Sequence, residues 1–70
     1  MKRIFKTLEV LKILYADGWS IKAIKGDHRQ LHHPTKPGKV TVSGKLSAPV
    51  PNSNLKSIER QSGVRIQETN

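Results

Sequence analysis

The sequence predicts a small α+β fold, in which a helix, three antiparallel strands and a second helix follow one another along the chain. Apolar residues recur at helical spacing near the start, alternate with polar residues in the middle, and return to helical spacing near the end. Both helices are expected to cover one face of the sheet and to leave the other face open to solvent. The 70 residues leave room for a single domain, residues 1–70, with a modest core.

The first helix is expected over about residues 3–16. Its apolar stripe consists of Ile4, Leu8, Leu11 and Tyr15, widened by Phe5 and Leu14. We interpret this stripe as core and not as a ligand site. Asp17–Gly18 should end the helix, because glycine readily takes the left-handed conformation that closes helices.

The first strand is expected at about residues 19–25. Alternation predicts one face made of Trp19, Ile21 and Ala23, and an opposite face made of Ser20, Lys22 and Ile24. Ile24 interrupts this pattern, because it places an apolar side chain among polar ones.

The second and third strands are expected at about residues 29–33 and 39–43. Gly26–Asp27 is typical of a turn, and residues 34–38, with two prolines and a glycine, are typical of a hairpin loop. In the third strand Val40 and Val42 should point inward, while Lys39 and Thr41 point outward.

The second helix is expected over about residues 52–62, with Leu55 and Ile58 as its apolar edge and Gly63 as its stop signal. Val64 and Ile66 should extend the core contact. Residues 67–70 are expected to form a loose tail.

The chain is strongly basic, with 13 Lys and Arg, 5 Asp and Glu, and a formal net charge of +8 at pH 7. Such a surplus is typical of a domain that binds a polyanion. The basic residues expected to contact such a polyanion are Lys22, Lys25, Arg29, Lys36, Lys39 and Lys45, and Asp27 is the one acid among them. The alternative is a solvated basic surface without a ligand.

Other site classes have little support. The chain has no cysteine, so no disulfide or thiolate metal site is expected. No apolar run has the length of a signal peptide or a membrane span, so we expect a cytoplasmic protein without membrane contact.

The three histidines are the first candidates for chemistry, because imidazole changes charge near neutral pH. Strand alternation places His28 and His32 on one face and Leu31 and His33 on the other. Since Leu31 should point to the core, His28 should point to solvent among the basic residues. A neutral imidazole there can take the proton of a ribose 2′-hydroxyl, although a histidine after a turn, taken alone, is more often an ordinary surface residue.

A zinc site is not expected, because adjacent strand residues such as His32 and His33 point in opposite directions. No metal and no cofactor is therefore predicted. We interpret His33, beside Pro34, as a structural residue that bridges the hairpin loop.

Several spaced motifs are similar to those of the HicA toxins, over roughly residues 8–64. They are Gly18–Trp19, Lys25–Leu31, His33–Pro34, Val40–Val42, Asn54–Ile58 and Gly63. The resemblance implies a double-stranded-RNA-binding-like fold and a catalytic site at Gly26, Asp27 and His28. It also implies that mRNA cleavage depends on His28. The chain departs from the family pattern at Leu31, where an aromatic residue is common, at residues 46–53, which lack an acidic pair, and at Glu59.

The resemblance further implies a HicB-type antitoxin partner that covers the active surface, with DNA contacted only through that complex. The predicted function is therefore the toxin of a type II toxin–antitoxin system, a metal-independent endoribonuclease with His28 as general base. Two alternatives remain open: a non-catalytic RNA-binding module that uses His28 as a phosphate contact, and a domain that docks an acidic protein. RNA cleavage separates the first two functions, and salt-sensitive RNA binding separates both from the third.

Overall fold

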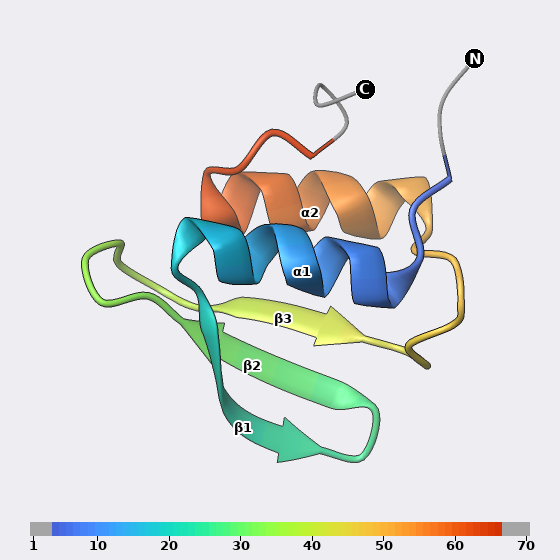
Figure 1. Cartoon of the computed structure of the whole chain (residues 1–70), viewed down its shortest axis with the longest axis horizontal. Helices are drawn as coiled ribbons and strands as arrows, with labels where there is room; N and C mark the ends of the chain where they lie inside the picture. Colours follow the sequence, from blue (N-terminus) through green and yellow to red (C-terminus); the bar gives the residue numbers. More distant parts are fainter. Residues whose placement is uncertain (1–3, 67–70) are drawn as a thin grey trace.

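The computed structural model describes residues 4–66, and the elements follow the predicted order (Figure 1). They are α1 (Thr7–Asp17), β1 (Ser20–Lys25), β2 (His28–His32), β3 (Val40–Ser43) and α2 (Asn52–Ser62). The strands pair antiparallel in the order β1-β2-β3, which confirms the α+β fold class. No helix in the described part of the chain is long and apolar enough to cross a membrane. The predicted tail at residues 67–70 lies outside the described residues.

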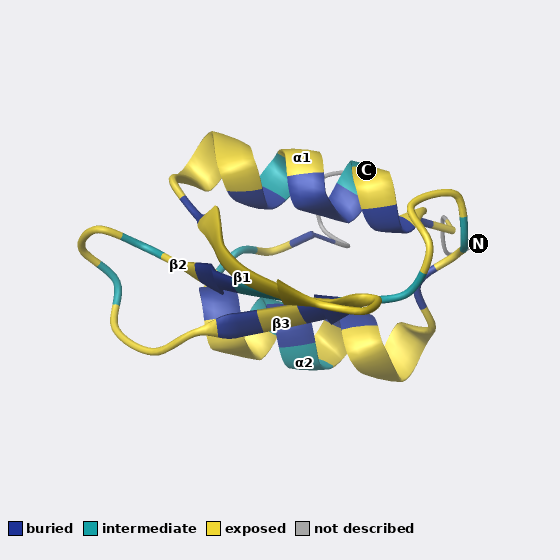
Figure 2. Cartoon of the chain, turned by 90° about the horizontal axis from the view of Figure 1, so that it is seen from below, coloured by how far each residue is buried: buried dark blue, intermediate teal, exposed yellow. Residues whose placement is uncertain are grey.

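Both helices and the sheet share one apolar core, and β3 makes the main contacts with the helices. Figure 2 shows the buried sides of α1 and α2 turned toward the strands. Val40 and Val42 are 0% and 1% exposed, and Lys39 and Thr41 lie at the surface, which confirms the predicted faces of β3. Each buried aliphatic side chain of this kind contributes about 1.5–3 kcal/mol to stability.

The second helix agrees with its prediction. Leu55 and Ile58 are buried, and Gly63 ends the helix with a left-handed φ of 74°. After this stop, Ile66 is fully buried and Val64 packs against the same core.

The first helix begins at Thr7, so the prediction that it starts near residue 3 is wrong. The preceding residues are extended, because their backbone groups pair with the segment before α2. The Phe5 carbonyl accepts a hydrogen bond from the Val50 N–H at 2.8 Å, and the Thr7 N–H donates to the Ala48 carbonyl at 2.9 Å. This pairing across the chain overrides the local helical pattern.

The buried stripe of α1 is rotated from the predicted one. Ile4, Leu8 and Tyr15 are 74%, 41% and 42% exposed, so their assignment to the core is wrong. Leu11, Leu14 and Phe5 are buried as predicted. Thr7 and Val10 complete the buried side of the helix with Leu11 and Leu14, at positions i, i+3, i+4 and i+7. The Thr7 hydroxyl donates to the Ala48 carbonyl at 3.1 Å, which satisfies the polar group that this rotation buries.

A β-bulge in β1 explains why the alternation there was ambiguous. Ile21 lies opposite Leu31 and Ala23 lies opposite Gln30, so Lys22 is an extra residue between them. The bulge places Ile21 on the Leu31 face and Ala23 on the other, so the prediction that they share a face is wrong. All six residues of β1 are exposed.

Gly18 ends α1 as predicted, and its surroundings require glycine for two reasons. Its φ of 110° is a conformation that side chains rarely adopt. A Cβ atom there would lie 2.7 Å from the Nε2 atom of His33, which is closer than the two atoms can approach.

We predict that Gly18→Ala destabilises the protein more than Gly38→Ala does. Gly38 has a φ of 79° but nothing within 4 Å of an added Cβ, so its replacement costs only the strain of a positive φ, about 1–2 kcal/mol. Gly18→Ala must in addition move the His33 ring and break a hydrogen bond that it makes, which should lower the stability by about 1 kcal/mol more. Urea unfolding of both variants measures the difference. Equal losses of stability would show that His33 adjusts without cost.

Candidate functional site

Two rows of side chains cross the face of the sheet opposite Leu31. The strand register pairs Lys25 with His28 and His28 with Ser43, so these three residues form the first row. The second row consists of Ala23, Gln30 and Thr41, which are paired in the same way. Directly opposed residues in antiparallel strands project on the same face with closely spaced Cβ atoms. His28 is therefore set beside a cation and a hydroxyl.

His28 lies at the surface and opens onto a hollow of about 420 Å³, here called the His28 hollow. Lys25, Gln30, Thr41 and Ala23 complete its lining. Its place agrees with the strand alternation, because Leu31 is fully buried on the other face. Within residues 4–66, no hydrogen bond or ion pair engages the imidazole of His28, so both of its nitrogens can meet a ligand.

The turn before His28 is fixed by backbone contacts. Gly26 has a φ of 59°, which favours glycine at the first position of this two-residue turn. The Asp27 carbonyl accepts hydrogen bonds from the Gly44 N–H and from Nη1 of Arg29, both at 3.2 Å. Arg29 Nη1 also donates to the Gly44 carbonyl at 2.9 Å. Arg29 thus holds the turn against the end of β3.

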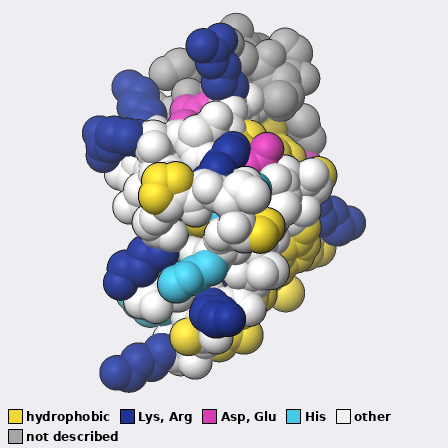
Figure 3. Space-filling model, turned by 90° about the vertical axis from the view of Figure 1, so that its left-hand side faces the viewer, with side chains coloured by type: hydrophobic (Ala, Val, Ile, Leu, Met, Phe, Trp, Pro, Cys, Tyr) yellow, Lys and Arg dark blue, Asp and Glu magenta, His cyan; other side chains and the backbone are white. Residues whose placement is uncertain are grey.

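The predicted basic residues do not all gather around His28. Lys25 is its direct neighbour on β1, and Lys45 follows Ser43 at the same end of the sheet. Lys39 precedes β3 at the opposite end, and Lys22 occupies the bulge. Figure 3, which shows the end of the molecule at the loop between β2 and β3, has Lys and Arg along one side and the lower part, with few acids between them.

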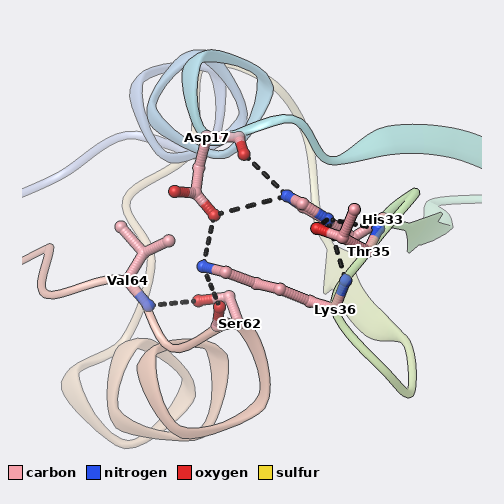
Figure 4. A network of polar contacts seen from close by, with 6 residues as sticks. All are labelled: Asp17, His33, Thr35, Lys36, Ser62 and Val64. Atoms are coloured by element: carbon pink, nitrogen blue, oxygen red, sulfur yellow. Dashed lines mark hydrogen bonds and ion pairs between the residues drawn. The ribbon is translucent and has the colours of Figure 1, made fainter.

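Lys36 lies in that loop, far along the sheet from His28. Its ammonium donates to the Asp17 carboxylate at 2.6 Å and to the Ser62 carbonyl at 3.1 Å. This side chain therefore links the ends of both helices, as Figure 4 shows. Like Arg29, it has partners inside the protein, and the remaining cations are better placed for a ligand.

His33 is structural, as the sequence indicated. Its Nε2 atom bonds to the Asp17 carbonyl at 2.7 Å, and its Nδ1 atom accepts from the backbone N–H groups of Thr35 and Lys36 at 3.1 and 3.0 Å (Figure 4). These partners assign the proton of the ring to Nε2. The ring also packs edge-on against Trp19, at a centroid distance of 5.2 Å.

His32 lies on the His28 face, opposite Ser20 at the far end of the sheet. Within residues 4–66, no group of three or more His, Cys, Asp and Glu side chains is placed to hold a metal ion.

The sequence reasoning missed the neutral residues beside His28. Ser43 stands opposite it, and Thr41 connects the His28 hollow to a second hollow lined by Asn54, Ser57 and Gln61 of α2. The position of Ser43 follows from counting residues back from the turn. The contribution of α2 depends on tertiary packing, which no local pattern reveals.

Residues 8–64 match the family model described as the HicA toxin of bacterial toxin–antitoxin systems. This range includes every helix and strand except the first residue of α1. No curated protein matches the chain.

The Asp17–Lys36 contact predicts a specific acid sensitivity. The hydrogen bond from Lys36 lowers the pKa of the Asp17 carboxyl below its ordinary value of 3.8. The stabilisation is therefore complete above about pH 4 and is lost as the pH falls through the lowered folded pKa. We expect Asp17→Asn to be less stable than the parent at pH 6, with a smaller further loss toward about pH 2.

Urea midpoints measured across this pH range test the linkage. Lys36→Met is the matched variant. It removes the cation, so its stability should fall less than that of the parent as the pH is lowered. Parallel pH profiles for all three proteins would contradict the assignment.

Proposed function

Because this chain belongs to the HicA toxin family, we propose that it acts as an endoribonuclease that cleaves mRNA without a metal ion. Family membership makes it the toxin of a bacterial toxin–antitoxin system, with an antitoxin as its partner. The observation that carries the proposal is the row of Lys25, His28 and Ser43 on the open face of the sheet, with an exposed imidazole at the edge of a hollow.

The proposed reaction begins with the neutral imidazole of His28, which takes the proton from a ribose 2′-hydroxyl. The 2′-oxygen then attacks the adjacent phosphorus, and the bond from phosphorus to the 5′-oxygen of the next nucleotide breaks. A 2′,3′-cyclic phosphate remains on one product, and the departing 5′-oxygen takes a proton from water. The hydroxide left from that water takes the proton back from His28 and restores the neutral imidazole. General base catalysis of this kind contributes about 10²–10⁴-fold to the rate.

Lys25 supplies the electrostatic part of the mechanism. Negative charge accumulates on the phosphoryl oxygens in the transition state, and the ammonium of Lys25 beside His28 stabilises it. Arg29 acts as a positioning residue, because its guanidinium bonds to the Asp27 and Gly44 carbonyls and so sets the turn that carries His28.

The antitoxin in this proposal is of the HicB type in a type II system, and it binds over Lys22, Lys25, His28 and Lys39. A net charge of +8 favours fast association with an acidic surface, and a protein that covers this face excludes the phosphate backbone. Binding would also stabilise the toxin, because the partner selects its folded state. We place this action in the cytoplasm, where mRNA is translated.

We predict that His28→Ala lowers the rate of RNA cleavage by about 10²–10⁴-fold while the protein stays folded. His28 is exposed, so the substitution should change stability by no more than about 0.5 kcal/mol. Cleavage of a defined transcript in excess EDTA, together with circular dichroism, measures both effects.

His32→Ala is the matched control, because His32 is an exposed histidine on the same face at the other end of the sheet. It should cleave at the parental rate. Full activity of a folded His28→Ala protein would disprove the catalytic assignment. Absence of cleavage by the parent, with RNA binding retained, would favour the non-catalytic RNA-binding module.

We further predict that Lys25→Gln weakens RNA binding and flattens its salt dependence. Losing one phosphate contact should reduce the slope of log K against log salt by about 0.7–0.9. Measuring affinity in a His28→Ala background keeps the RNA intact during the titration.

Lys12→Gln removes the same charge from an exposed position on α1 and should leave the slope unchanged. Equal slopes for Lys25→Gln and its parent would place the RNA elsewhere. A slope near zero for the parent would favour docking of an acidic protein instead.

A further inference from the structure

A second hollow adjoins the His28 hollow along α2. Its volume is about 170 Å³, and it shares Thr41 with the His28 hollow. Ser43 also lines it, directly opposite His28 in the strand register, so the two hollows form a continuous surface that starts at the imidazole. The volume of the second hollow is well above the roughly 10–15 Å³ that a single water molecule needs. We call it the α2 hollow.

Polar side chains from two elements line the α2 hollow. Thr41 and Ser43 come from β3, and the others come from α2. Asn54, Ser57 and Gln61 lie at positions i, i+3 and i+7 of α2 and so share one side of the helix. The carboxamide oxygen of Gln61 accepts a hydrogen bond from the Thr41 N–H at 3.4 Å, which links the helix to the outer edge of β3.

The lining of the hollow is mostly polar. Val50 and Ile58 also line it, but they are only 8% and 3% exposed and add little apolar surface. A ligand there therefore meets mainly amide and hydroxyl groups.

The two hollows differ in the charge of their lining, and this difference indicates which part of a nucleotide each can bind. Lys25 and His28 line the His28 hollow, whereas every side chain that lines the α2 hollow is uncharged. Asn, Gln and Ser side chains bind both phosphates and the edges of bases, but the cations that supply most of the affinity for phosphate line only the His28 hollow. The α2 hollow therefore suits a base better than a phosphate.

We propose that the α2 hollow is a subsite for the base of the nucleotide next to the cleaved bond, and that Asn54 and Ser57 read the edge of that base. The inference rests on the proposed endoribonuclease function and extends it to the substrate. It requires single-stranded RNA, because only an unpaired base can turn its hydrogen-bonding edge into such a hollow.

The test compares cleavage positions in a transcript of mixed sequence, mapped by sequencing the product ends. The parent should prefer one base, or one pair of related bases, at a fixed position beside the cut. In Asn54→Ala/Ser57→Ala this preference should fall by about tenfold, the effect of losing one specific base contact, while cuts at other bases persist. Ser53→Ala removes a hydroxyl from α2 outside the hollow and should keep the parental preference.

The outcomes separate the subsite from the function on which it rests. If the parent cleaves RNA and the double variant keeps the same preference, the subsite is wrong and the endoribonuclease stands. A parent that cuts all bases equally also overturns the subsite. A parent that does not cleave RNA disproves the function itself.

A second readout uses uncleaved oligonucleotides with the His28→Ala protein: the side-chain amide NMR signals of Asn54 should shift with the preferred base and not with polyphosphate.

Discussion

The imidazole of His33 holds together the segments that meet at one end of the molecule. It bonds to the last residue of α1 through the Asp17 carbonyl and to the loop before β3 through the N–H groups of Thr35 and Lys36. Lys36 extends the contact to the end of α2 through the Ser62 carbonyl. A Cβ at position 18 would collide with this ring, so the turn into β1 depends on it as well. His28 lies at the other end of β2. It is exposed to solvent, and within residues 4–66 its imidazole makes no hydrogen bond that supports the fold.

The sheet is supported unevenly, and this bears on both stability and binding. The helices contact β3, while β1 is exposed along its whole length and keeps Ile24 at 63% exposure. An open edge of this kind invites pairing with another chain, and a bulge with lysines beside it discourages such pairing. Lys22 in the bulge and Lys25 at the end of β1 fit this protective role. The same lysines flank the His28 face, so one pair of residues serves both solubility and the proposed contact with RNA.

The sequence was a good guide where local pattern and tertiary packing agree. Val40 and Val42, with Leu31, defined the core face of the sheet, and the opposite face with His28 followed from alternation. The sequence was a poor guide where contacts with a distant segment determine the bounds or the buried side of an element. The start of α1 depends on pairing with residues 46–50, which rotates the buried stripe by one position. An inserted residue in β1 reverses the faces, and in the sequence it shows as the broken alternation at Ile24, which does not reveal where the insertion lies. The family resemblance pointed to the turn at residues 26–28, but not to the hollow that β3 and α2 line.

Counting basic residues overstates how many of them can meet RNA. Arg29 and Lys36 both lie in the basic middle of the chain, yet each bonds to backbone carbonyls that hold a turn or a helix end in place. Arginine suits the first role, because one guanidinium nitrogen can bridge two carbonyls in a fixed geometry. The remaining lysines lie around a face whose far side, along α2, is neutral. Under the proposed function, the charge beside His28 would hold the phosphate backbone, and the amides beyond it would be left to recognise the base. Contacts to phosphate carry no sequence information, so recognition of a base has to come from other groups.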